Sequence, residues 1–121
     1  MRTDYHLHTP LCGHASGAPR DYILAAQRAG LGEIGFSDHN PMPTQFDDWR
    51  MGPNQLPEYV EMIREAQREF PDYPIRLGLE CDYLPNYKGY IDYLAMRADW
   101  DYLIGSVHYV TPDWDIDNPK H

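Results

Sequence analysis

Short apolar runs alternate with amphipathic segments along the chain. The runs are of strand length and are flanked by glycine, proline or polar residues, whereas the segments between them carry apolar residues at helical spacing. The clearest helix, over 57–70, places Tyr59, Ile63, Ala66 and Phe70 on one side. Strands are predicted at 3–8, 33–37, 75–80 and 102–108, and helices at 21–29, 57–70 and 90–98.

Two further segments lack this periodicity. The proline-rich stretch 40–53 is long enough to be a functional loop. The stretch from Thr111 onward is polar and turn-rich and predicts little order of its own.

The order strand, helix, strand, helix predicts an α/β fold, a parallel sheet with helices packed against it. Crossovers between parallel strands are right-handed in nearly all proteins, which leaves few topologies. With 121 residues, 42% of them hydrophobic, the chain has the size and composition of one domain. We therefore expect a single domain of about four strand–helix units.

Charge and composition narrow the classes of function. Ten Lys and Arg residues against 19 Asp and Glu give a net charge of −9, which argues against binding nucleic acid or anionic lipid. No apolar run approaches the ~20 residues that cross a bilayer, and the opening residues do not form a signal peptide. Cys12 and Cys81 lie far apart and are expected to be free thiols. We expect a cytoplasmic protein without membrane or nucleic-acid partners.

Residues that bind metal ions stand at the end of each predicted strand. The carboxyl ends of the strands of a parallel barrel open on one face, where sites are built. Successive strand ends are one strand–helix unit apart, so these side chains are expected to meet. The residues are His6 and His8, Asp38 and His39, Glu80 and Asp82, and His108.

This set of residue types suits a particular chemistry. Residues two apart on a strand point to the same side, so His6 and His8 can hold one ion together. Imidazole and carboxylate suit zinc, iron or manganese, and Glu80 could bridge two ions. Two ions ~3.5–4 Å apart activate a shared water for phosphoester hydrolysis.

Each residue alone also has a structural interpretation. A single His-x-His arises by chance, Asp38 could cap a turn, and Glu80 could pair with Arg76. His14, beside a glycine, and His108, at a strand end, could be structural histidines. The coincidence of metal-binding residues at four strand ends favours a metal site. The acidic residues at 47–48 and 113–117 are interpreted as solvated loops, and the cysteines are not expected to coordinate.

Four motifs carry a resemblance to a known family. They are Asp4-Tyr5-His6-Leu7-His8-Thr9 followed by Cys12-Gly13-His14, then Gly35-Phe36-Ser37-Asp38-His39, Gly78-Leu79-Glu80-Cys81-Asp82-Tyr83 and Gly105-Ser106-Val107-His108-Tyr109. As a set they resemble the polymerase-and-histidinol-phosphatase (PHP) superfamily, most of all its monofunctional histidinol phosphatases. The resemblance spans essentially the whole chain.

The resemblance implies a distorted seven-stranded barrel of the TIM-like type with up to three divalent ions in its mouth. His6, His8 and Glu80 would hold the first ion, Glu80 and His108 the second, and His14 and His39 the third. The candidate catalytic residues are Glu80, His108 and Asp38. The implied reaction is hydrolysis of the small substrate L-histidinol phosphate in histidine biosynthesis, with a hydroxide shared by the ions attacking phosphorus.

The chain departs from the family in length. Members are about twice as long, near the ~250 residues of a typical barrel, and carry further ligands and basic residues in their second half. The chain therefore resembles the N-terminal half of such an enzyme, a half-barrel whose inner face and sheet edges lie open. Open edges predict self-association, and the missing ligands predict weak or absent activity. A PHP phosphoesterase acting on nucleotides and a non-catalytic metal-binding module are the alternatives.

Overall fold

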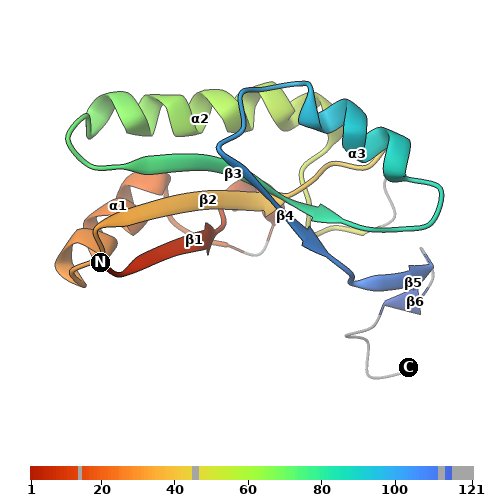
Figure 1. Cartoon of the computed structure of the whole chain (residues 1–121), viewed down its shortest axis with the longest axis horizontal. Coiled ribbons are helices and arrows are strands. Elements are labelled where there is room, and N and C mark those ends of the chain that lie inside the picture. Colours follow the sequence, from red (N-terminus) through yellow and green to blue (C-terminus); the bar gives the residue numbers. More distant parts are fainter. Residues whose placement is uncertain (14, 45–46, 112–113, 116–121) are drawn as a thin grey trace.

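The computed structural model describes residues 1–13, 15–44, 47–111 and 114–115. Four strands form one parallel sheet in which every strand pairs with the next strand along the chain. This order is that of consecutive strands in a (βα) barrel, so the predicted half-barrel is observed (Figure 1). The strands are β1 (Thr3–Leu7), β2 (Glu33–His39), β3 (Ile75–Asp82) and β4 (Tyr102–Ser106).

Three helices connect the strands, and α2 and α3 run across the same side of the sheet (Figure 1). They are α1 (Pro19–Arg28), α2 (Leu56–Glu69) and α3 (Lys88–Ala95), with the short 3-10 helices η1 (Pro10–Cys12) and η2 (Pro53–Gln55). Helix α1 begins with Pro19 at its first position, and the Asp21 side chain accepts the Ala18 N–H at 2.9 Å. No helix in the described ranges is long and apolar enough to cross a membrane.

The main core lies between the helices and the face of the sheet that they cover. All seven residues of β2 are buried, as expected for a central strand of a parallel sheet. Tyr59 and Ile63 of α2 are fully buried against this face. The strand residues of the core are Ile34, Phe36, Ile75, Leu77, Leu79 and Cys81.

On the opposite, inner face of the sheet, a tyrosine ring covers part of the surface between the strands. The ring of Tyr102 lies across Gly35 and Gly78, where a Cβ at either glycine would overlap it. Its hydroxyl donates to the carbonyl of Tyr5 at 2.6 Å. Tyr5 remains 37% exposed, so the inner face keeps the partial exposure that a half-barrel predicts.

Two short strands follow β4 within the described residues, and the composition of this segment does not predict them. Strands β5 (Tyr109–Thr111) and β6 (Trp114–Asp115) form an antiparallel pair. Tyr109 anchors the pair, because its hydroxyl donates to Asp47 at 2.8 Å and its ring stacks on Trp49. The side chain of Asp47 is therefore buried and hydrogen-bonded, which corrects its interpretation as part of a solvated acidic loop. Residues 113 and 116–117 lie outside the described ranges.

Candidate metal centre

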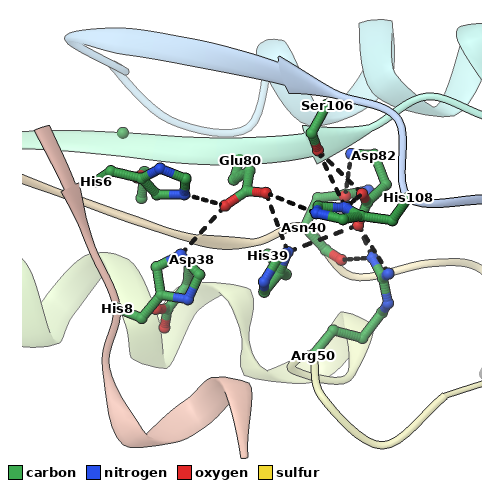
Figure 2. Close-up of polar contacts among 12 residues, drawn as sticks. His6, His8, Asp38, His39, Asn40, Arg50, Glu80, Asp82, Ser106 and His108 are labelled. Carbon is green, nitrogen blue, oxygen red and sulfur yellow. Dashed lines mark hydrogen bonds and ion pairs between the residues drawn. The ribbon is translucent and has the colours of Figure 1, made fainter. Parts of the chain in front are cut away.

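The strand ends converge because of the register of the sheet. His39 is the direct partner of Glu80 across β2 and β3, so their side chains leave the same face. Asp82 lies two residues beyond Glu80 and pairs with Ser106, with His108 two residues further on. Figure 2 shows these side chains pointing toward one another, with His6 and His8 approaching from β1 and the chain after it.

Glu80 is the centre of the arrangement. Its Oε1 contacts Nε2 of His6 and lies 3.2 Å from Nε2 of His8. Its Oε2 lies 3.6 Å from Nδ1 of His39 and 3.6 Å from Nε2 of His108. Each carboxylate oxygen therefore faces two imidazoles, and the carboxylate can bridge two ions as the sequence predicts.

The two distances from His39 to the neighbouring carboxylates fit a shared metal ion better than direct hydrogen bonds. Ligands about 2.0–2.2 Å from a tetrahedral ion lie roughly 3.3–3.6 Å from one another. The distances from His39 Nδ1 to Glu80 and to Asp82 are 3.6 and 3.7 Å, longer than hydrogen bonds but close to this separation. His39, Glu80, Asp82 and His108 thus form a group that can hold an ion, as do His6, His8 and Glu80.

The protonation states also fit metal binding. Burial would raise the pKa of Glu80, but hydrogen bonds from His8 and His6 and nearby imidazole charge lower it to about 2. Burial lowers the pKa of His39, which keeps its ring neutral at neutral pH. Metal ligands must be deprotonated, and both groups meet that condition without the ion's help.

Asp38 lies in a different setting from its neighbour His39. It is fully buried, and its carboxylate accepts the N–H of Thr9 at 2.6 Å and the Thr9 hydroxyl. Burial is the largest influence on its pKa, which rises to about 6. With His8 and Cys12 it forms a third group that could hold an ion. The catalytic role of Asp38 stays a prediction, and the structure gives it a contact that fixes the turn after β1.

The predicted pairing of His14 with His39 is not tested by the described residues. His14 lies outside the described residues, so its share in a third ion stays a prediction. His39, its expected partner, turns toward Glu80 and Asp82 because of its register with β3. The surface pairing of Glu80 with Arg76 is not observed, since Arg76 binds Glu33 and Glu80 is 2% exposed.

Arg50 and Asn40 were not among the predicted site residues, whereas Asp82 was predicted at a strand end without an assigned ion. Asp82 contacts Nδ1 of His108. It lies two residues after Glu80, and this spacing in the sequence predicts that the two side chains share one face of β3. Arg50 donates to Asp82 at 2.8 Å, and Asn40 accepts the Asp82 N–H at 2.9 Å. Arg50 and Asn40 lie in the loop after β2, where no local sequence pattern predicts the direction of a side chain.

The sequence profile of the PHP domain matches residues 4–120. The chain belongs to the PHP domain family. A probable histidinol-phosphatase of Deinococcus radiodurans is 50% identical over 119 residues, which cover 97% of this chain and 45% of that protein. A histidinol-phosphatase of Lactococcus lactis is 32% identical over 110 residues, 90% of this chain and 40% of that protein.

Solved structures agree with the PHP assignment. The crystal structure of Lactococcus lactis histidinol phosphate phosphatase, complexed with zinc, L-histidinol and phosphate, matches with a TM-score of 0.78 at 32% identity. The match covers 90% of this chain and 41% of that one. A Listeria monocytogenes structure matches with a TM-score of 0.79 at 24% identity and supports the fold. The PHP domain described here thus spans less than half the length of these relatives.

Proposed function

We propose that this chain carries part of the metal centre of a metal-dependent phosphomonoester hydrolase of the histidinol-phosphatase type. The observation that carries the proposal is Glu80, whose two carboxylate oxygens each face two imidazoles. The name of the Deinococcus relative and the zinc, L-histidinol and phosphate in the Lactococcus structure support the substrate class.

The ligands divide into two sets around Glu80. His6 and His8 would hold one zinc, iron or manganese ion on Oε1, and His39 and His108 a second ion on Oε2. Such ions lower the pKa of bound water and neutralise charge on phosphoryl oxygens. His14 is proposed as a ligand of a third ion.

The chain's own residues prepare the centre for this chemistry. Glu80 stays ionised because of its hydrogen bonds from His8 and His6, and His39 stays neutral because it is buried. The net reaction adds water across the phosphorus–oxygen ester bond, giving an alcohol and inorganic phosphate. Arg50, the guanidinium that Figure 2 labels beside the centre, is bound to Asp47 and Asp82. We therefore expect low activity from these residues alone.

The first test measures metal content and activity together. Protein purified without chelator or affinity histidines should contain at least one equivalent of zinc, iron or manganese by elemental mass spectrometry. Glu80→Gln should lose it, whereas Glu65→Gln, at an exposed position of α2, should retain it. Folded wild-type protein that binds none of these metals would contradict the proposal.

A substrate panel then distinguishes the alternatives. L-histidinol phosphate should be hydrolysed faster than nucleoside monophosphates by the metal-loaded protein, with the rate abolished by Glu80→Gln. A preference for nucleotides would favour the nucleotide phosphoesterase. Bound metal with no hydrolysis of any phosphomonoester, even when the chain is extended to its relatives' length, would favour the non-catalytic module.

We also propose that the sheet edges recruit further strands. Strands β1 and β4 are the outer strands of the sheet and leave unpaired backbone groups along it. In a protein made of these 121 residues the pairing strand would come from a second copy. Light scattering after size-exclusion chromatography should show a dimer or larger species, and a monomer at ~100 μM would refute the idea. A cytoplasmic location stays a prediction.

A further inference from the structure

Arg50 is a buried arginine held at three points beside the metal centre. Its side chain is 1% exposed. Nε donates to both carboxylate oxygens of Asp47 at 2.8 and 3.0 Å, and Nη1 donates to the carbonyl of Asn40 at 2.8 Å. Nη2 donates to Oδ2 of Asp82 at 2.8 Å. The planar guanidinium fork makes these contacts in fixed directions, which a single ammonium group could not reproduce.

Asp82 divides its two oxygens between Arg50 and His108. Oδ2 accepts from Arg50, while Oδ1 contacts Nδ1 of His108 and accepts the Ser106 hydroxyl at 3.0 Å. The Asp82 side chain is fully buried, and its own N–H donates to Asn40 Oδ1 at 2.9 Å. Rotation of the carboxylate would break contacts on both sides, so its orientation is fixed.

The fixed carboxylate determines which nitrogen of His108 carries hydrogen. The guanidinium of Arg50, which donates to Oδ2 of Asp82 at 2.8 Å, places a positive charge against this carboxylate and keeps it ionised. An ionised carboxylate only accepts hydrogen bonds, so Nδ1 of His108 must donate. The bare Nε2 of the neutral ring then lies 3.6 Å from Glu80 Oε2, on the side where an ion would bind.

We propose that Arg50 is a positioning residue that acts through Asp82 to hold His108 as the Nδ1–H tautomer, with Nε2 directed at Glu80. The role of this tautomer in metal binding rests on the proposed metal centre. The tautomer itself can be measured in the metal-free protein. Without Arg50, Oδ2 of Asp82 is free to turn toward His39, whose Nδ1 lies 3.7 Å away, and His108 loses its fixed acceptor. Groups that orient metal ligands in this way typically contribute about 10–100-fold to metal affinity.

The experiment reads the tautomer directly. Protein labelled with ¹⁵N-histidine is studied with chelator at about pH 8, where ordinary imidazoles are neutral, by long-range ¹H–¹⁵N correlation. His108→Gln assigns the signals. Wild-type His108 should show protonated Nδ1 and bare Nε2. In Arg50→Lys the other tautomer should become populated, and zinc affinity should fall about 10–100-fold.

Matched variants separate this role from general stability. Arg76→Lys changes another paired arginine, bonded to Glu33 at 2.6 Å on the inner face, and should leave the His108 spectrum and zinc affinity unchanged. If circular dichroism shows that Arg50→Lys does not fold, Asp47→Asn weakens the hold on Arg50 without touching Asp82. It should shift the tautomer in the same direction.

The outcomes distinguish this inference from the proposed function. Wild-type His108 with bare Nδ1 would overturn the inference whatever the variants do. If Arg50→Lys folds and its His108 tautomer is unchanged, the inference is also overturned. If Arg50→Lys does not fold, an unchanged His108 tautomer in Asp47→Asn overturns it. Wild-type protein that shows the Nδ1–H tautomer and its loss in Arg50→Lys, yet binds no zinc, would support the positioning and refute the metal centre.

Discussion

Neutralising Glu80 tests how strongly the imidazoles stabilise its charge. In metal-free protein the pKa of Glu80 falls from 4.5 to about 2, mainly because hydrogen bonds from His8 and His6 outweigh burial. At about 1.4 kcal/mol for each pH unit, the fall corresponds to about 3.5 kcal/mol of folding free energy. The Gln amide of Glu80→Gln keeps part of the hydrogen bonding, so about 3.5 kcal/mol is the upper value for the loss.

The pH range of the effect follows from the direction of the shift. A carboxyl whose pKa is lower in the folded state stabilises above its unfolded pKa of 4.5, and the gain is lost as pH falls toward 2. The stability difference between wild type and Glu80→Gln should therefore be fully present at about pH 5.5 and 7.5 and close to zero near pH 2.

Urea unfolding in the presence of EDTA measures this difference. Free energies of unfolding for wild type, Glu80→Gln and the control Glu65→Gln are compared at about pH 2.5, 5.5 and 7.5. The control should follow the wild type at every pH. A difference for Glu80→Gln that is independent of pH, or a variant as stable as wild type at pH 5.5, would refute the electrostatic reasoning.

Three further predictions concern the metal, the inner face and the turn after β1. Zinc at about 100 times its Kd should stabilise the wild type by about 2.7 kcal/mol, reversibly with EDTA, and should stabilise His8→Ala far less; equal stabilisation of both would contradict the site. Gly35→Ala should cost about 1–3 kcal/mol of stability because its Cβ overlaps the ring of Tyr102. The control Gly105→Ala meets open space and should cost under about 0.5 kcal/mol. Equal losses in urea unfolding would contradict the packing. Thr9→Val should cost about 1–3 kcal/mol because it removes a hydroxyl donor from the buried carboxylate of Asp38, and a thermal melt equal to wild type would contradict this.

Strands β2, β3 and β4 could be predicted from the sequence because each is a short apolar run, and β1 because polar and aromatic residues alternate around Leu7. The third helix was placed over 90–98 but occupies Lys88–Ala95. Near its end the indole of Trp100 donates to the carbonyl of Leu94 at 2.9 Å, a contact that helical periodicity does not reveal. The β5–β6 pair was missed for a similar reason, since Tyr109 is anchored by Asp47 from a distant loop.

The convergence of the candidate ligands could be predicted as far as they lie on strands. Spacing along a strand gives the face of each side chain, and the strand order brings the ends together. Arg50 could not be predicted, because its direction depends on the path of the loop after β2. Its partner Asp82 is 32 residues away, and nothing in the local composition links the two.

Strand alternation also separates the roles of two adjacent residues, Asp38 and His39. Neighbours on a strand point to opposite faces, so only one of them can share the face of Glu80. His39 is the register partner of Glu80 and takes that position. Asp38 must then be buried toward the helices, and the N–H and hydroxyl of Thr9 provide the donors that a buried carboxylate requires. Because Thr9 directly follows His8, this contact favours an indirect role in which Asp38 holds His8 in place.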